Sequence, residues 1–336
     1  YGDDRRTELI EDDSATLPVV ENKPVAEDTA ILRLRDGQLR RMSPRMVDKY
    51  LAQPGAKDEV VEIIQTATDE TLYFFTNKGN CFMLDVSKIP ETMRLKERGS
   101  LLTGLIAGLA DHEHAVAMVC VKSDEMAKKG DFLFITKNGQ VKRTAAAEYG
   151  IRRARFAAIN LKGDDELVGM VQVDPDDKDD IILITKQGLA LRFKLDTVSC
   201  TGRATAGVRG IDVSKGDEVR CFEIPKAGDM LLVISDRGFG KRMLSDDVER
   251  QGRAGKGQKL LPMNKTGETG TQLAVCLNVT DAQSVRVEQK HGHVTMLNMD
   301  EIPVERRSGK GQLLINVLLD DIVQYGALTA ETKDEK

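Results

Sequence analysis

The chain of 336 residues repeats one pattern of polar and apolar positions six times. Each copy begins with a polar residue, continues through apolar or β-branched residues to a turn that ends in glycine, and resumes with alternating residues. The copies are DTAILRLRDGQLRR from Asp28, ETLYFFTNKGNCFML from Glu70, DFLFITKNGQVKR from Asp131, DIILITKQGLALRF from Asp180, DMLLVISDRGFGKR from Asp229 and QSVRVEQKHGHVTML from Gln283. Their turn glycines, 42 to 60 residues apart, are Gly37, Gly79, Gly139, Gly188, Gly238 and Gly292. Such a recurrence predicts a repeat architecture.

Each copy predicts a β-hairpin. Ile, Leu, Val, Phe and Thr favour strands, and glycine supplies the positive φ that a tight turn requires. Asn138-Gly139 matches a two-residue type I′ turn. After a mostly polar stretch, most units continue with a second strand pair, as in 157–173 and 207–224.

Four short strands in each of six units predict an all-β fold of six radial, four-stranded blades, as in a propeller. An array of hairpins without ring closure is the alternative. We expect one domain over 28–325, after an acidic connector over 1–27 and before a polar tail over 326–336. Helix signals are weak and are limited to 46–51 and 123–129.

Composition narrows the class of protein. Aromatic residues make up 4% of the chain and Trp is absent, so we expect a core built mainly from Ile, Leu, Val and Met. No apolar run approaches the 18 residues of a membrane span, and the charged first residues do not resemble a signal peptide. The chain lacks an initiator Met, which indicates a piece of a longer protein. The five widely spaced cysteines suit buried thiols of a cytoplasmic protein better than disulfides or a zinc site.

Charge is distributed unevenly along the chain. The net charge of −5 combines −6 over residues 1–28, +4 over 29–318 and −3 over 319–336. Residues 128–162 alone carry +7. The acidic ends therefore mask a basic body, and local charge matters more than net charge for binding a polyanion.

Two basic features recur in this body. The first is a pair of cations soon after the turn glycine, and its members are Arg40, Arg41, Lys142, Arg143, Lys241 and Arg242, with Arg192 alone in the fourth unit. Units two and six depart from the pattern, with Phe82-Met83 and Thr295-Met296. We expect these cations near an exposed blade edge, where they either bind DNA or only prevent edge-to-edge aggregation.

The second feature is a basic, glycine-rich loop in the middle of most units. Its cations are Arg94, Lys96, Arg98, Arg152, Arg153, Arg155, Arg203, Arg209, Arg250, Arg253, Lys256, Arg306, Arg307 and Lys310. Small neighbours would let a backbone approach a phosphate closely. The simpler interpretation is a solvated loop that happens to be charged.

Radial blades would bring equivalent positions onto one rim. The basic loops would then form a curved positive track that bends duplex DNA through phosphate contacts, with little base readout. We find no catalytic arrangement and no metal site, because the pairs His112/His114 and His291/His293 lack further ligands in register.

These repeated units and basic loops resemble the C-terminal DNA-binding domain of the type IIA topoisomerase A subunit, found in DNA gyrase and topoisomerase IV. The opening residues Tyr1–Thr7 look like the end of the breakage-reunion part of that subunit. The resemblance covers essentially the whole chain. It implies a six-bladed β-pinwheel that bends or wraps duplex DNA, in a cytoplasmic, nucleoid-associated bacterial enzyme.

The resemblance also implies which functions lie outside this segment and which partners it has. The catalytic tyrosine lies upstream, and Mg²⁺ and ATP belong elsewhere in the holoenzyme, so no cofactor is expected here. The implied partners are duplex DNA, the ATPase B subunit, and a second A subunit through the missing N-terminal part. No membrane contact is expected.

One departure bears on the subtype. Gyrases carry the box Gln-Arg-Arg-Gly-Gly-Lys-Gly in the first blade, whereas the corresponding loop here is Gln53–Asp58, without arginines. A partial match, Gln251–Gly257, lies in the fifth unit. The departure slightly favours a topoisomerase IV-like role, although six blades suit gyrase.

Two other classes of function stay open at this point. The repeat alone would also suit a protein-interaction propeller of the kelch or WD40 kind, although the Trp-Asp signature is missing. An enzyme acting at a central channel would need carboxylates or histidines that converge from several blades.

Overall fold

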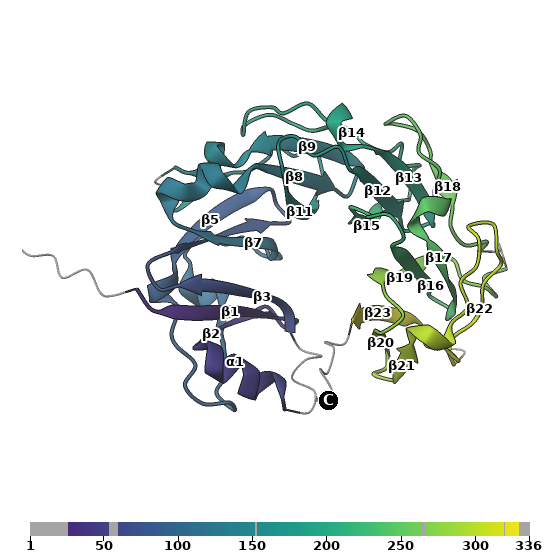
Figure 1. Ribbon diagram of the computed structural model, residues 1–336, viewed down its shortest axis with the longest axis horizontal. Helices are drawn as coiled ribbons and strands as arrows, with labels where there is room; N and C mark the ends of the chain where they lie inside the picture. Colours follow the sequence, from purple (N-terminus) through teal and green to yellow (C-terminus); the bar gives the residue numbers. More distant parts are fainter. Residues whose placement is uncertain (1–25, 54–59, 152, 264–265, 319, 329–336) are drawn as a thin grey trace, which may run out of the picture.

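Six antiparallel β-sheets follow one another along the chain and stand around a common centre (Figure 1). The computed structural model describes residues 26–53, 60–151, 153–263, 266–318 and 320–328. The prediction of a six-bladed, all-β, propeller-like fold is confirmed. The last strand extends to Leu328, three residues beyond the expected end of the domain at 325.

A hairpin forms the middle of each blade, and it begins within one residue of the predicted start. All six turn glycines have positive φ, between 75° and 88°, as a tight turn requires. The hairpins are β1 (Asp28–Leu34) with β2 (Gln38–Met42), β4 (Thr71–Thr76) with β5 (Asn80–Asp85), β8 (Asp131–Thr136) with β9 (Gln140–Ala145), β12 (Asp180–Thr185) with β13 (Leu189–Lys194), β16 (Met230–Ser235) with β17 (Phe239–Leu244), and β20 (Ser284–Gln289) with β21 (Val294–Asn298).

A third strand of the same unit pairs with the first strand of each hairpin and faces the centre of the ring (Figure 1). These inner strands are β3 (Val60–Ala67), β7 (Ala115–Val121), β11 (Leu167–Val173), β15 (Val219–Glu223), β19 (Leu273–Val279) and β23 (Val323–Leu328).

The fourth strand of each complete blade comes from the next unit along the chain. These short outer strands are β6 (Ser100–Leu101), β10 (Arg155–Ala157), β14 (Val208–Arg209), β18 (Gln258–Lys259) and β22 (Gln312–Leu313), in blades one to five. The expectation of a second strand pair within most units is therefore wrong. The strands exist, but β10 and β11 belong to different sheets, as do β14 and β15. Within its described residues the sixth sheet has three strands, β21-β20-β23.

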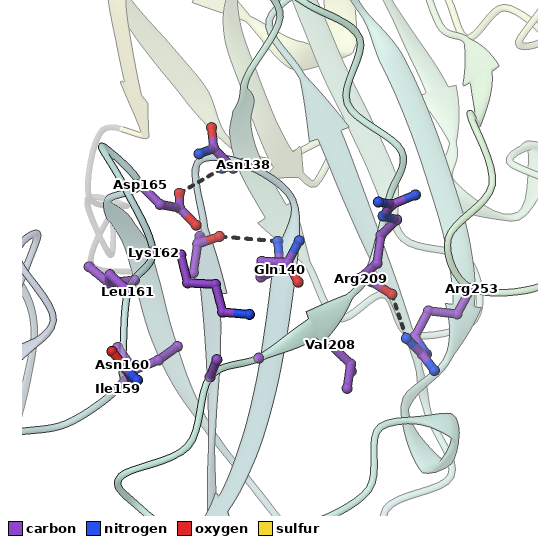
Figure 2. A pocket seen from close by; sticks show the side chains of 13 residues that line it. Asn138, Gln140, Ile159, Asn160, Leu161, Lys162, Asp165, Val208, Arg209 and Arg253 are labelled. Atoms are coloured by element: carbon purple, nitrogen blue, oxygen red, sulfur yellow. Dashed lines mark hydrogen bonds between the residues drawn. The ribbon is translucent and has the colours of Figure 1, made fainter.

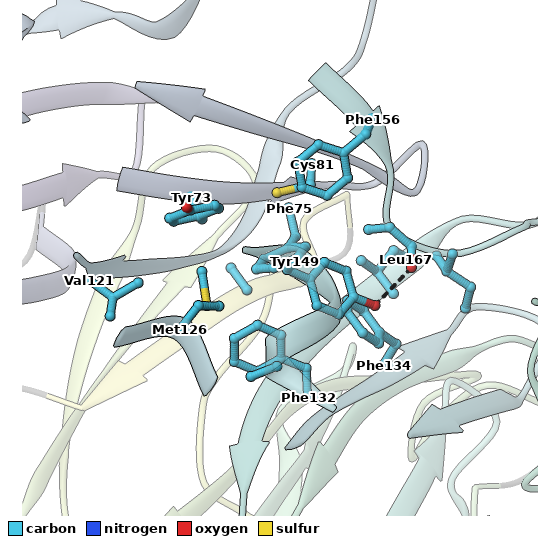
Figure 3. Close-up of a cluster of buried hydrophobic side chains, with 14 residues drawn as sticks. Tyr73, Phe75, Cys81, Val121, Met126, Phe132, Phe134, Tyr149, Phe156 and Leu167 are labelled. Atoms are coloured by element: carbon cyan, nitrogen blue, oxygen red, sulfur yellow. Dashed lines mark hydrogen bonds between the residues drawn. The ribbon is translucent and has the colours of Figure 1, made fainter. Parts of the chain in front are cut away.

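The hydrophobic core lies between neighbouring blades. Most clusters are aliphatic, as composition predicts, but the cluster between blades two and three is aromatic (Figure 3). The Phe75 ring meets the rings of Phe132, Phe134 and Tyr149 edge to face, with centroids 5.4–5.6 Å apart. The buried Tyr149 hydroxyl donates to the carbonyl of Ala158 at 2.9 Å, so its polar end is satisfied.

Within the described residues, helices are few and short. Both weak helix signals form, as α1 (Pro44–Leu51) and the 3-10 segment η2 (Ser123–Lys129). The others are α3 (Leu102–Leu105), η1 (Val86–Lys88), η3 (Ala146–Tyr149), η4 (Leu195–Thr197), η5 (Ser245–Asp247) and η6 (Met299–Glu301). In the described part of the chain, no helix has the length and apolar character of a membrane span.

The seam between blades one and six is built differently from the other blade contacts. In the first unit, the segment that follows the hairpin forms α1. In each later unit, the corresponding segment forms the outer strand of the preceding blade. Val47 and Tyr50 of α1 are instead buried against the first blade. Blades one and six meet through Arg35, whose Nη1 lies 2.6 Å from a carboxylate oxygen of Glu288 and whose guanidinium lies 4.2 Å from the ring centroid of Tyr325.

The paired cations after the turn glycine are turned inward, and most of them hold the chain that crosses from the next unit. Lys142 and Lys241 are 1% and 0% exposed. The Lys241 ammonium donates to three carbonyl oxygens of that chain, those of Arg306 at 3.1 Å, Arg307 at 2.6 Å and Gly309 at 2.8 Å. Lys142 donates to the carbonyl of Ala158 in its own unit, at 3.1 Å, and to that of Arg203 in the next unit.

The paired arginines are also engaged, with carboxylates of their own hairpin or with carbonyl oxygens. Arg143 Nε lies 2.6 Å from a carboxylate oxygen of Asp131, and Arg192 Nε lies 2.6 Å from one of Asp180. Further contacts of this group join Arg40 to the Leu95 carbonyl at 3.3 Å, Arg41 to the Ile89 carbonyl at 2.7 Å, and Arg242 to the Ile302 carbonyl at 2.6 Å and to Asp281.

The expectation that these paired cations sit exposed at a blade edge is thus wrong. The crossing chain covers that edge and presents carbonyl oxygens, and buried carbonyls need donors. The correction applies to Arg40, Arg41, Lys142, Arg143, Arg192, Lys241 and Arg242, of which Arg41 and Arg192 keep slight exposure.

The buried ammonium of Lys142 predicts a pH-dependent stability. Burial lowers the pKa of Lys142 from 10.5 to about 8, and the nearby Arg203 guanidinium adds to this. Between these values the unfolded chain binds more protons than the folded one, so raising the pH favours folding. From pH 7.5 to 9.5, we expect the free energy of unfolding in urea to rise by about 1–2 kcal/mol more in the native chain than in Lys142→Met.

The exposed Lys256→Met serves as the control and should keep the native pH dependence. Equal pH dependence in the native chain and in Lys142→Met would contradict the account of the buried ammonium.

Candidate nucleic-acid interface

Five loops carry the chain from one unit to the outer edge of the preceding blade. We call them crossing loops 1 to 5; they comprise residues 91–101, 150–157, 200–209, 250–259 and 304–313. Four touch the second hairpin strand first through a parallel bridge, at Glu91, Cys200, Arg250 and Val304. All five end in the antiparallel outer strand. In these four, both ends are fixed to one strand, and the residues between them form a bulge.

The glycine just before the outer strand serves strand docking. A Cβ at this position would lie 2.5–2.8 Å from a carbonyl oxygen of the hairpin strand, in a contact that real side chains do not make. The glycines concerned are Gly99, Gly207, Gly257 and Gly311. We expected glycines on these loops to let the backbone approach a phosphate closely. Gly202 and Gly252 are the glycines that fit this expectation, because they are exposed and have open space around them.

Most cations predicted on these loops are exposed to solvent. They are Arg94, Lys96, Arg98, Arg153, Arg155, Arg209, Arg250, Lys256, Arg306 and Lys310. The crossing loops lie along the outer edge of the ring, where β14, β18 and β22 are labelled in Figure 1. The structure therefore gathers these cations on the outer edge, as the repeat predicts. Arg152 lies outside the described residues.

Two of the exposed cations also hold the loops in place. Arg155 donates to the Gly108 carbonyl at 3.0 Å and lies over the Phe82 ring. Arg250, whose side chain is 52% exposed, shares the buried Asp180 carboxylate with Arg192. Burial alone would raise the pKa of Asp180, but the hydrogen bonds from the two guanidinium groups outweigh it, and the pKa is lowered. Asp180 therefore stays ionised and anchors loop 4.

Three predicted cations are half-buried rather than exposed. Arg203, Arg253 and Arg307 each donate a hydrogen bond to a main-chain carbonyl of the preceding crossing loop.

A pocket of about 490 Å³ opens beside β14 (Figure 2). Its lining combines the cations Lys162, Arg209 and Arg253 with the amides of Asn138 and Gln140. Lys162 is an exposed cation that is not among the cations predicted on the basic loops. Lys162 could have been predicted as part of this surface, because it lies beside a basic loop in the most basic stretch of the chain.

The features considered for other chemistry have structural roles. The Glu113 carboxylate, between His112 and His114, accepts hydrogen bonds from Thr76 at 2.6 Å and Asn80 at 2.7 Å. Among the described residues, no group of three or more His, Cys, Asp or Glu side chains could hold a metal ion.

All five cysteines are free thiols. Cys81, Cys120 and Cys276 are buried as expected, whereas Cys221 is half-buried and Cys200 is exposed. Burial raises the pKa of Cys120 to about 12, which makes this thiol a poor nucleophile.

Comparisons with known proteins agree with this architecture. The family described as "DNA gyrase C-terminal domain, beta-propeller" matches residues 70–103, 130–174, 179–220 and 229–269. The DNA gyrase A subunit of Deinococcus deserti is 33% identical over the whole of this chain, which spans 42% of that protein. The A subunit of Staphylococcus aureus strain MRSA252 is 29% identical, again over the whole chain, which spans 38% of it. The chain thus covers less than half the length of these relatives.

Solved structures agree as well. The C-terminal domain of DNA topoisomerase IV superposes with a TM-score of 0.80 at 25% identity, over 91% of this chain and 94% of that one. A DNA gyrase A C-terminal domain superposes with a TM-score of 0.63 at 19% identity, over 90% of this chain and 100% of that one, which supports the fold alone. Together with the five exchanged outer strands, these likenesses show that the chain belongs to the family of C-terminal β-propeller domains of the DNA gyrase and topoisomerase IV A subunits.

Proposed function

We propose that this chain binds and bends duplex DNA through phosphate contacts along the outer edge of the ring. The observation that carries the proposal is the set of exposed cations that recur on crossing loops of five consecutive blades. Lys and Arg that neutralise phosphates release condensed counterions, which drives binding without reading sequence. A duplex that touches several consecutive loops must follow the curvature of the ring, so binding and bending are coupled.

Duplex DNA suits this surface better than a single strand. Single-strand binding relies on aromatic side chains on which bases stack. Within the described residues, none of the exposed large apolar side chains is aromatic. The largest rings, including those of Phe75 and Phe134, are buried between blades.

We further propose that the chain serves the A subunit of a type IIA topoisomerase. The breakage chemistry and its Mg²⁺ would lie in the upstream part of that subunit, which would also form the A-subunit dimer. ATP would bind to the B subunit. The chain itself would contribute the geometry of the bound DNA.

Within this family we propose a topoisomerase IV-like role rather than the introduction of negative supercoils. Two observations support it: Gln53–Asp58 lacks the arginines of the gyrase box, and α1 stands where a first crossing loop to blade six would begin. Of Gln53–Asp58, only Gln53 lies within the described residues. The box-like residues Gln251–Gly257 form crossing loop 4, which explains their place in the fifth unit.

Removing one exposed loop cation should weaken binding to every duplex sequence alike. Arg153→Ala is expected to lower the slope of log K against log salt concentration by about 0.9, the value for one phosphate contact. Fluorescence anisotropy of a labelled duplex over a salt series measures this slope. The control Lys226→Ala, in the exposed connection between β15 and β16, should leave it unchanged.

A native chain that binds duplex DNA with no dependence on salt would contradict the proposed phosphate contacts. Capture of a peptide partner by a chain that fails to bind DNA would favour an interaction propeller instead.

The subtype can be tested with the full-length A subunit and its ATPase partner. On relaxed circular plasmid with ATP, we expect no accumulation of negative supercoils, and on catenated or supercoiled plasmid we expect decatenation or relaxation. Gel electrophoresis with an intercalator resolves these products. Negative supercoils would show a gyrase instead, and would leave the DNA-binding proposal standing.

A further inference from the structure

Arg203, Arg253 and Arg307 occupy one equivalent position in crossing loops 3, 4 and 5. Each follows the parallel bridge of its loop by three residues, the bridges being at Cys200, Arg250 and Val304. All three are half-buried, whereas cations beside them, such as Lys256, are exposed.

Each of these arginines reaches back to the preceding loop and meets the last residue of its outer strand. Nη1 of Arg203 lies 2.7 Å from the carbonyl oxygen of Ala157, at the end of β10. The other two contacts repeat this geometry, from Arg253 to the Arg209 carbonyl at 2.5 Å and from Arg307 to the Lys259 carbonyl at 3.1 Å. Ala157, Arg209 and Lys259 are the last residues of β10, β14 and β18.

These three hydrogen bonds connect crossing loops 2, 3, 4 and 5 in series across blades two to five. A cationic donor makes such a bond stronger than a neutral one. The Arg203 guanidinium also lies 5.1 Å from the Phe156 ring centroid, which orients it along the loop. The distance from each bulge to the next is therefore set by a side chain rather than by the sheets alone.

The acceptor in each bond is a main-chain carbonyl, so one residue can accept this bond through its main chain and present its side chain to solvent. The carbonyl of Arg209 receives Arg253, while the Arg209 side chain is 62% exposed on the loop surface. Replacing the Arg209 side chain removes an exposed cation and keeps the acceptor of the tie.

We propose that Arg203, Arg253 and Arg307 are positioning residues: they fix the spacing of the cationic bulges, and so the bend imposed on DNA, without contacting phosphates themselves. This inference rests on the proposed binding of duplex DNA. It separates the predicted cations of the crossing loops into residues that hold DNA and residues that hold the loops at the required spacing.

The test compares bend and salt dependence in the same variants. A duplex of about 30 base pairs, a length over which a 40–90° bend is accessible, carries a donor and an acceptor dye at its ends. Energy transfer at saturating protein reports the bend, and a salt series reports the phosphate contacts. The variants are Arg203→Ala, Arg253→Ala and the conservative Arg253→Lys, with Arg209→Ala as the matched control.

We expect Arg203→Ala and Arg253→Ala to lose energy transfer while keeping the native salt slope. Arg253→Lys should restore part of the energy transfer, because an ammonium can still donate to the Arg209 carbonyl. Arg209→Ala should show the opposite split, with the slope lowered by about 0.9 and the bend retained at saturation. Thermal melting checks that each variant is folded.

Loss of about 0.9 in slope from Arg253→Ala with an unchanged bend would overturn the inference, because that residue would then be a phosphate contact. An unchanged bend and slope in both alanine variants would overturn it as well. Failure of the native chain to bind duplex DNA would instead remove the proposed function on which the inference rests.

Discussion

In blades one to five, the outer edge of the central hairpin needs a partner strand, and the next unit along the chain supplies it. A two- or three-residue strand such as Val208–Arg209 cannot stand alone, so it is held by the paired strand, by the preceding glycine and by buried cations such as Lys142. This exchange joins five blades to their successors. Because the exchanging chain must travel around the outside, each blade also receives one loop on the outer edge of the ring.

Cationic side chains have two different roles at this edge. Lys241 of β17 is buried and donates to three carbonyl oxygens of crossing loop 5, whereas Lys310 of that loop is exposed. A buried ammonium is tolerated only where such acceptors surround it. The buried cations thus hold the crossing loops that carry the exposed cations. The charged surface therefore depends on side chains that are themselves buried.

Much of the fold could be predicted from the sequence, because the hairpins carry strong signals. A turn glycine such as Gly139 after a run such as Phe132–Ile135 predicts a hairpin, and its recurrence predicts blades. The exchange of strands could not be predicted, since Gln258–Lys259 is too short to show any periodicity. The burial of Lys142 and Arg143 was missed for a related reason, because carbonyls that accept their hydrogen bonds, such as those of Arg203 and Asp174, lie 61 and 31 residues further along the chain. The exposed loop cations, in contrast, lie on the outer edge as expected.

DNA bound along the outer edge of the ring should cover the crossing loops and leave the rest of the ring accessible. Lysine acetylation in the presence and absence of duplex DNA, read by mass spectrometry, measures this coverage residue by residue. We expect Lys96, Lys256, Lys259 and Lys310 to be protected by DNA, while the exposed Lys128 and Lys226, outside the crossing loops, react equally in both cases. Protection of Lys128 and Lys226 with continued reaction at the crossing loops would contradict the account.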